Sequence, residues 1–286
     1  MSHAVVVGVD GSVQSAAAAE WAARQAQRSG CALRMIHAGG AEPALLPEPT
    51  DRAQSLPRPV LELRNLLSDL LPGLEISCEH VPGHPVNALA AAGDREGLLV
   101  LGSRGLGGLA GLLVGSVALR TAAHAACPVV LVRQGWEGDG GVQSGVVVGV
   151  DSARLSGEVL AFAFEQAAVR GAKLRVLESR SLSTGRYVTA APADPPEIMK
   201  ALAAEAPARL EDALAPWREK FPEVPVKAEV TAWPAGRALV EASRSASLTV
   251  VGRRTSKTRP AVPGLGAVAH AVLHHAHSPV AVVPHD

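Results

Sequence analysis

An internal repeat constrains this fold more than any other feature of the sequence. The hexapeptide VVVGVD at residues 5–10 recurs unchanged at residues 146–151, which is 141 positions later. At the same spacing, LRMI at residues 33–36 is matched by LRVL at residues 174–177. Copies of more than 130 residues are far longer than the units of a solenoid. The chain is therefore expected to contain two duplicated domains.

The predicted domains are residues 1–134 and residues 145–286, joined by a glycine-rich stretch without apolar periodicity, which is typical of a linker. The spacing of the repeat grows to 151 for the PV pair at residues 128–129 and 279–280. The second copy therefore carries about ten extra residues, and a cluster of prolines places them between residues 179 and 230.

Strand-like and helix-like segments alternate within each copy. Residues 4–9 form a continuous apolar run, which indicates a strand covered on both faces. Ser12 suits a helix N-cap and Gly30 a helix end. The first copy is predicted to contain strands at 4–9, 31–37, 74–80, 98–102 and 128–133 and helices at 12–29, 57–70, 85–92 and 115–126. This α/β order predicts two tandem, doubly wound parallel five-stranded sheets with strand order 3-2-1-4-5, which bind ligands at the carboxyl ends of the strands.

The composition argues against several classes of function. The chain has 27 basic and 27 acidic residues, so its formal net charge of zero does not favour binding to nucleic acid or to an anionic membrane. Aromatic residues make up only 3%, which disfavours stacking platforms for single-stranded nucleic acid. The sequence has no uninterrupted apolar stretch of membrane-spanning length and no signal-peptide pattern. Three cysteines without a CxxC pair suit a reducing compartment, so a cytoplasmic location is expected.

A glycine-rich loop follows the predicted fourth strand. Gly102 and Gly105 are separated by two residues, and nine residues later Gly115 and Ser116 begin a predicted helix. Glycines let a backbone turn sharply and approach a ligand closely. The N–H groups at the start of the helix carry partial positive charge and would point at a phosphate, to which the Ser116 hydroxyl and the Arg104 guanidinium would add donors.

Other interpretations of this loop were compared. The glycines could only shape a mobile loop, with Ser116 as a helix cap, but their place between a strand and a helix favours a phosphate site. No GxxxxGK[ST] motif is present, so the loop is not a P-loop. Residues 105–110 fit GxGxxA, yet they follow the fourth strand and have no acidic partner about 20 residues on, which disfavours a dinucleotide fingerprint.

The combined pattern resembles the universal stress protein family. ATP-binding members of that family carry Gly, two residues, Gly, nine residues, Gly, and then Ser or Thr. The segments VGVDGS at residues 7–12, PGHP at 82–85 and CPVVLV at 127–132 also match the family, and the resemblance spans both copies. It implies a Rossmann-like fold of the adenine nucleotide α hydrolase type, with ATP as the ligand, with or without Mg²⁺.

The resemblance also implies which residues contact the nucleotide. They are Val9, Asp10, Ala38, Gly102, Arg104, Gly105, Gly115, Ser116 and Val117. Val9, Asp10 and Ala38 would border the adenosine. Gly102, Arg104 and Gly105 would follow the ribose and phosphates. Gly115, Ser116 and Val117 would present amides and a hydroxyl to the phosphates. Asp10 also suits a turn that helps to cap the helix after Ser12.

The second copy departs from this pattern. Thr255 stands at the position of Gly105, Ala267 replaces Ser116, and the loop between them is one residue longer, whereas Asp151 is retained. The added side chain and the lost hydroxyl predict a degenerate loop. The basic residues between positions 253 and 259 are interpreted as a solvated loop.

The resemblance suggests a nucleotide-dependent regulatory module of the stress response that acts through a protein partner. Two alternatives stay open, namely a slow ATPase or nucleotidyl-transferring enzyme and a scaffold that binds no nucleotide. No Ser-Gly-Gly-x-Asp-Ser loop or carboxylate cluster supports catalysis, so no catalytic residue is assigned. His270, His274 and His277 have helical spacing but no nearby carboxylate or thiolate, so no metal site is assigned either.

The last strand of each copy is expected at a sheet edge, where unpaired N–H and C=O groups invite another strand. In the family, two such edges pair across a two-fold axis. The tandem chain is expected to pair residues 128–133 with residues 279–283 in antiparallel fashion, which makes an intramolecular pseudo-dimer. Any further homodimer would then use other surfaces.

Overall fold

The computed structural model describes residues 4–39, 56–105, 114–136, 145–180, 196–255 and 264–286, without the side chains of residues 196–204. The first half contains β1 (Val5–Gly8), α1 (Val13–Ser29), β2 (Leu33–Ala38), α2 (Arg58–Leu70), β3 (Ile76–Val81), α3 (Pro85–Glu96), β4 (Leu99–Gly102), α4 (Ser116–His124) and β5 (Val129–Val132). The second half contains β6 (Gly145–Val150), η2 (Ser152–Arg154), α5 (Gly157–Arg170), β7 (Leu174–Ser179), α6 (Pro196–Lys220), β8 (Val226–Thr231), α7 (Ala235–Ala242), η3 (Ser243–Ser245), β9 (Ala246–Arg254), α8 (Ala267–His275) and β10 (Val280–His285).

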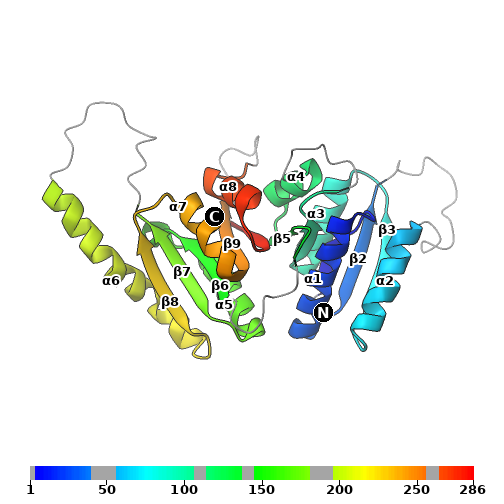
Figure 1. The fold of residues 1–286 in the computed structure, drawn as a ribbon, viewed down its shortest axis with the longest axis horizontal. Helices are drawn as coiled ribbons and strands as arrows, with labels where there is room; N and C mark the ends of the chain where they lie inside the picture. Colours follow the sequence, from blue (N-terminus) through cyan, green and yellow to red (C-terminus); the bar gives the residue numbers. More distant parts are fainter. Residues whose placement is uncertain (1–3, 40–55, 106–113, 137–144, 181–195, 256–263) are drawn as a thin grey trace.

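The strands form one continuous ten-stranded sheet in the order β3-β2-β1-β4-β5-β10-β9-β6-β7-β8. Each half is parallel internally and has the predicted order 3-2-1-4-5. The halves meet where β5 and β10 pair antiparallel, with Val130 opposite Ala281. Figure 1 shows the two halves side by side, with β5 beside the C-terminal half. The pairing of the two edge strands within one chain is therefore confirmed, and it turns two five-stranded sheets into a single mixed sheet.

Each face of the sheet carries a hydrophobic core that runs through both halves. The core on one face includes residues of α1, α2, α5 and α6, and the core on the other face includes residues of α3, α4, α7 and α8. Because helices cover both faces, a central strand such as β1 is apolar, and all four residues of β1 are buried. The covered strands explain the continuous valine runs of the sequence.

The first helix begins and ends as its sequence predicts. The Ser12 hydroxyl accepts a hydrogen bond from the Ser15 amide at 3.1 Å, which caps the start of α1. Gly30 ends the helix in the left-handed conformation with φ of 63°. Ser156 and Gly171 repeat this arrangement on α5. The caps fix where α1 starts, and the start of α1 forms one wall of the site described below.

Side chains also join the halves across the β5–β10 seam. The Arg253 guanidinium donates to the carbonyl of Ala125 at the end of α4, and Arg253 is only 5% exposed. In the opposite direction, Arg133 donates to the carbonyl of Leu273 on α8 at 2.7 Å. The interpretation of the basic run as a solvated loop is therefore wrong for Arg253. Lys257 and Arg259, from the same run, lie outside the described residues.

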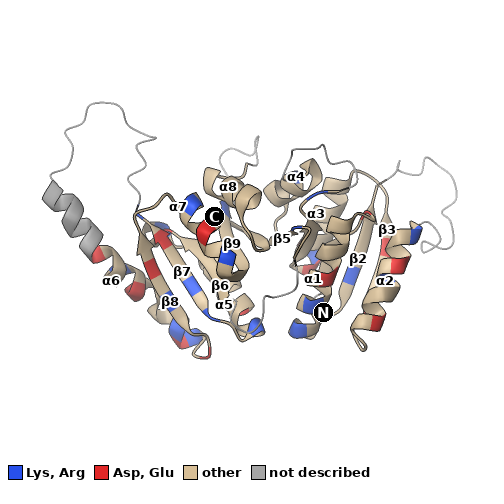
Figure 2. Ribbon diagram, in the orientation of Figure 1, with Lys and Arg blue, Asp and Glu red and all other residues tan. Residues whose placement is uncertain are grey.

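Charges of both signs are interspersed over the two halves, as Figure 2 shows. Arg34 on β2 illustrates the pattern. Its guanidinium nitrogens lie 2.6 Å from a carboxylate oxygen of Glu79 on β3 and 3.2 Å from one of Glu96 at the end of α3. Among the described residues, no helix has the length and apolar character needed to cross a membrane.

Candidate functional site

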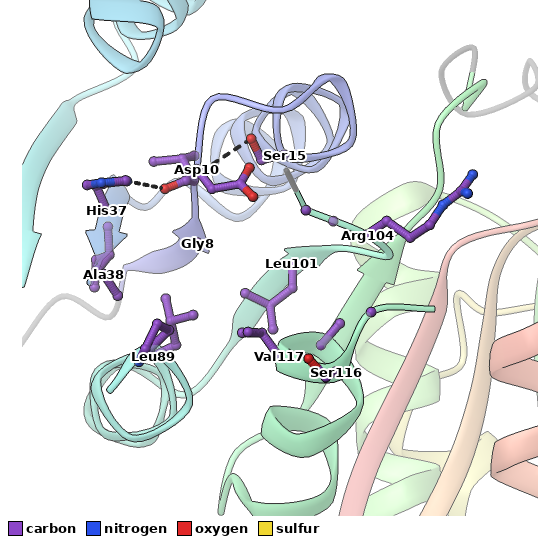
Figure 3. Close-up of a pocket in the computed structure, with 17 residues that line it drawn as sticks. Gly8, Asp10, Ser15, His37, Ala38, Leu89, Leu101, Arg104, Ser116 and Val117 are labelled. Atoms are coloured by element: carbon purple, nitrogen blue, oxygen red, sulfur yellow. Dashed lines mark hydrogen bonds between the residues drawn. The ribbon is translucent and has the colours of Figure 1, made fainter. Parts of the chain in front are cut away.

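A cavity of about 350 Å³ opens at the carboxyl ends of β1, β2 and β4. This position is the switch point of the first half, where the chain leaves β1 toward one face of the sheet and β4 toward the other. All nine residues predicted to contact a nucleotide line this cavity: Val9, Asp10, Ala38, Gly102, Arg104, Gly105, Gly115, Ser116 and Val117. The fold thus brings together segments that lie more than 100 positions apart in the sequence, and Figure 3 shows them around one space.

Asp10 organises the corner between β1 and α1. Its Oδ1 accepts the Ser12 amide at 3.0 Å, and its own amide donates to the Ser15 hydroxyl at 3.4 Å. Gly11, between them, has φ of 85°, a conformation that favours glycine. The Asp10 carboxylate is thereby held against the glycine loop, where a Cβ atom on Gly105 would collide with Oδ2. The turn role predicted for Asp10 is confirmed, and the same carboxylate faces the cavity.

Gly102 lines the cavity and also packs closely on α1. A Cβ atom there would lie 2.8 Å from the carbonyl carbon and oxygen of Gln14 and 3.0 Å from the Ser15 amide nitrogen, all in the backbone of the first turn of α1. Real Cβ atoms do not come this close to a backbone. Close packing on the capped end of α1 therefore requires glycine here, independently of the role at a ligand that the loop motif predicts.

Gly115 also differs from the expectation. It adopts φ of −79° and ψ of 157°, which any residue can adopt, and a Cβ atom would make only ordinary contacts of 3.5 Å or more. Its amide donates to the Ser103 carbonyl at 2.7 Å, so this N–H holds the loop closed and does not point at a ligand. The N–H groups that a bound anion can reach are those of the first helical turn of α4, which have no acceptor within the helix. Ser116 and Val117 of that turn are exposed to the cavity.

Arg104 lines the cavity, but its side chain takes another direction. Figure 3 shows its guanidinium turned away from Asp10 and Ser116. Burial and the charge of Arg104 together lower the pKa of Arg133, which places the two guanidinium groups near one another. In this conformation Arg104 lies toward the seam between the halves, and a change of rotamer would be needed to bring it over the cavity.

The opposite end of the cavity is less polar. Val9, Ala38 and Leu89 form part of the wall at the ends of β1 and β2 and on α3. The His37 Nδ1 lies 2.9 Å from the Val9 carbonyl oxygen, which fixes the ring at this end. The cavity therefore has a polar end at the start of α4 and an end suited to a flat, weakly polar group between β1 and α3.

Sequence reasoning missed several residues of the wall: Gly8, Ser15, Ile36, His37, Pro85, Leu89, Leu101 and Ala118. Two signals could have found some of them. His37 precedes Ala38 at the end of a predicted strand, and strand ends in such sheets form the binding edge. Leu89 lies one helical turn after Pro85, on the same face of α3. Within the described residues, no group of three or more His, Cys, Asp or Glu side chains could hold a metal ion.

The loop is built differently in the second half. β9 continues straight to Arg254, and the Thr255 amide donates to the carbonyl of His285 on β10 at 2.7 Å. In the first half, β4 stops at Gly102 and the chain turns. Thr255 thus pairs with β10, whereas Gly105 follows a turn after β4, so the two loops begin along different paths.

Comparison with known proteins assigns the family. The sequence model of the universal stress protein family matches residues 1–133 and residues 145–284. Universal stress protein Rv2005c of Mycobacterium tuberculosis is 33% identical over 297 aligned positions, covering 98% of this chain and 96% of the relative. The crystal structure of a universal stress protein from Archaeoglobus fulgidus superposes with a TM-score of 0.61 at 16% identity, covering 99% of each chain. Another structure, of the universal stress protein from Archaeoglobus fulgidus in complex with dAMP, matches 50% of this chain and 98% of the other at 23% identity and a TM-score of 0.34. The two matched copies and the full-length relatives show that this chain belongs to the universal stress protein family.

Proposed function

We propose that the N-terminal cavity binds one adenine nucleotide, ATP, and that the chain is a cytoplasmic regulatory module that acts through a protein partner. In this proposal residues 1–134 form a domain with an intact nucleotide loop, and residues 145–286 form a domain with a degenerate loop. The observation that carries the proposal is that all nine residues of the predicted site line one cavity. Its volume of about 350 Å³ lies in the usual range for small-molecule sites.

The two ends of the cavity suit the two ends of a nucleotide. The adenine would lie between the ends of β1 and β2 and α3, beside Val9 and Ala38. The phosphates would lie at the start of α4, where the Ser116 hydroxyl and the first-turn amides donate hydrogen bonds and the helix dipole favours negative charge. The Asp10 carboxylate lies between these ends, within reach of a ribose hydroxyl.

Gly102, Gly105 and Gly115 have indirect roles in this proposal. Gly102 lets α1 pack closely on β4, Gly105 leaves room for the Asp10 carboxylate, and the Gly115 amide closes the loop on Ser103. Together they hold the Ser116 hydroxyl and the α4 amides in place before a ligand arrives. Arg104 would reach the outer phosphates after a rotamer change and would then leave the neighbourhood of Arg133.

The arrangement favours binding over turnover. Asp10 is the one carboxylate among the described lining residues, so a Mg²⁺ ion would be held mainly by the nucleotide's phosphates and water. The His37 imidazole is tied to Val9 at the β2 end, whereas Ser116 lies at the α4 end (Figure 3). A general base would need to be within hydrogen-bond reach of the attacking water at the phosphates. We therefore expect turnover to be absent or far below about 1 s⁻¹, the lower end for ordinary enzymes.

Titration calorimetry of the full chain with ATP tests this function. Ser116→Ala should weaken binding by about 0.5–1.5 kcal/mol, or about 1.5–3 kcal/mol if the hydroxyl meets the full phosphate charge. Gly115→Val, which the glycine motif alone predicts to abolish binding, should leave the fold intact and weaken binding only modestly, because the backbone there is extended and a Cβ atom makes contacts of 3.5 Å or more. Ala267→Ser, at the matching position of the second half, should leave the affinity unchanged. The proposal is wrong if ATP does not bind, or if a rapid Mg²⁺-dependent turnover disappears in Ser116→Ala.

A further inference from the structure

A second cavity lies at the matching strand ends of the C-terminal half, and it is larger than the first. Its volume is about 720 Å³, compared with about 350 Å³ in the first half. The carboxyl ends of β6, β7 and β9 form its floor, and the starts of α7 and α8 contribute to its wall. Because the two halves are copies of one fold, the difference in volume must come from local changes in the chain.

One such change is a later helix start. α1 begins five residues after Gly8, whereas α5 begins eight residues after Gly149, because the short helix η2 is inserted. In the first half, Gly102 packs on the backbone of α1. In the second half, Gly252 contacts the His285 imidazole and the Val159 side chain. The withdrawn helix opens the cavity, and His285 occupies the part of the space closest to Gly252.

A second change removes one side-chain donor and straightens the loop, whereas the first-turn amides of α8 remain, with Ala267 and Val268 of that turn on the cavity wall. Thr255 is bonded to β10 through its amide and, at 3.0 Å, through its hydroxyl to the His285 carbonyl. Ala267 has no hydroxyl where Ser116 has one. The tight turn that packs against Asp10 in the first half is therefore replaced by a straight strand in the second.

The charged residues on the wall of this cavity are mostly cationic. Arg154, Arg237 and Arg254 line it, with Asp151 as the one acidic residue among the described lining residues. Within the described part of the chain, the ion pairs of arginine involve other residues, and none includes these three. Arg237 is held in place by stacking on Trp233, with its guanidinium carbon 4.5 Å from the ring centroid. All three arginines are exposed, so their charges lie at the mouth of the cavity.

The deeper wall of the cavity is apolar. Leu177, Leu239 and Val251 are at most 6% exposed and line it together with Val150. An apolar interior below a cationic mouth matches a ligand with an apolar body and an anionic head. The first cavity has a similar apolar wall, so the larger volume and the cationic mouth are what distinguish the second cavity.

We propose that the C-terminal cavity binds an organic anion that has an apolar aromatic or aliphatic body and a dianionic head group. The body would fill the space above Leu239 and Val251, and the head group would lie among Arg154, Arg237 and Arg254. Guanidinium groups bind phosphate and carboxylate through paired hydrogen bonds, so they would replace the hydroxyl donor that Ala267 lacks and add to the first-turn amides of α8. The two cavities of one chain would then take chemically different ligands.

The test uses 1-naphthyl phosphate as the probe and fluorescence titration of the full chain as the measurement. The double variant Arg237→Gln/Arg254→Gln should bind the probe about tenfold more weakly or worse, because two charged hydrogen-bond donors are lost. The control Arg58→Gln/Arg64→Gln removes the same net charge from α2 of the other half and should bind normally. Arg237→Lys/Arg254→Lys should recover only part of the affinity, because lysine restores the charge but not the paired donors. The alcohol 1-naphthol, which has no phosphate, should bind much more weakly than the probe.

The proposal is overturned if the probe fails to bind, if the glutamine pair binds it as well as the control pair does, or if naphthol binds equally well. It is also overturned if ATP displaces the probe from this cavity at the concentration that fills the first one, since the cavity would then be a second nucleotide site. Probe binding that survives in Gly105→Thr would place it outside the N-terminal cavity, and its loss there would contradict the assignment. Failure of the nucleotide proposal would appear separately, as an absence of ATP binding.

Discussion

The carboxylate of Asp10 occupies the space that a side chain on residue 105 would need, so that any residue larger than Gly105 would have to displace it. The two residues are 95 positions apart, and they join the end of β1 to the loop after β4. The second half keeps the carboxylate as Asp151 but has Thr255 at the loop position. There Asp151 caps η2 through the Ala153 amide at 3.1 Å, and Thr255 pairs with β10. The exchange of Gly105 for Thr255 thus goes together with a change in the path of the chain, which turns after β4 in the first half and continues along β9 in the second.

Gly105→Thr should therefore convert the first loop toward the second. The new side chain would displace the Asp10 carboxylate and weaken its hydrogen bond to the Ser12 amide, which costs about 0.5–1.5 kcal/mol of stability. We expect the ATP affinity, measured by calorimetry, to fall at least about tenfold. Gly157→Ala, which adds a Cβ in open space at the start of α5, serves as the control. Equal affinities in both variants would show that the contact between Asp10 and Gly105 does not shape the site.

The matched glycines Gly102 and Gly252 should respond differently to alanine. At Gly102 the new Cβ would meet fixed backbone of α1 at 2.8 Å, and overpacking of this kind costs about 1–3 kcal/mol. At Gly252 it would meet the end of the His285 ring at 2.7 Å, which can move, so the loss should be below about 1 kcal/mol. Urea unfolding of the two variants measures both values. Losses of equal size would contradict the packing role given to Gly102.

Val130 is fully buried in the strand that joins the halves, opposite Ala281 of β10. Val130→Asp should place an unpaired carboxylate at this seam and destabilise the protein by about 3 kcal/mol or more. Val282→Asp should act in the same way from the other strand, and both variants should expose apolar surface to a dye. Val13→Asp, on the exposed start of α1, is the control. If Val130→Asp unfolded at the same urea concentration as Val13→Asp, the claim that the β5–β10 pairing stabilises the protein would be contradicted.

His274 should make the stability of the protein depend on pH. Burial, followed by the charges of His270, His275 and Arg133, lowers its pKa in the folded protein. The unfolded chain then binds a proton more readily, since its histidine titrates at about 6.5. Stability should therefore fall as the pH drops below about 6.5, and it should fall less in His274→Gln. Chemical unfolding between pH 5 and pH 8 checks this, with the exposed His277→Gln as the control. Identical pH profiles for both variants would contradict it.

Much of this architecture could be predicted from local sequence signals. Continuous apolar runs such as β1 imply strands covered on both faces, and the caps at Ser12 and Gly30 set the limits of α1. The apolar edges of the two copies implied their pairing. The residues of the predicted site also line one cavity, because the carboxyl ends of parallel strands meet at one edge of the sheet.

The partners of individual groups could not be predicted, because they depend on how distant segments meet. The Gly115 amide bonds to Ser103 instead of pointing at a ligand, and this follows from the turn after β4. Arg253 reaches Ala125, which is 128 positions away in the other half, so a local run of basic residues could not reveal its burial. The neighbour that makes Gly102 necessary is the backbone of α1, which carries no signal in the glycine motif itself.

Native mass spectrometry of the purified full chain, alone and after addition of ATP, tests the central claim most directly. The account predicts one adenine nucleotide per chain, and its loss in Gly105→Thr but not in Ala267→Ser. Two nucleotides per chain with equal affinity would contradict the assignment of the site to the first half. A single nucleotide that stays bound in Gly105→Thr would contradict it as well.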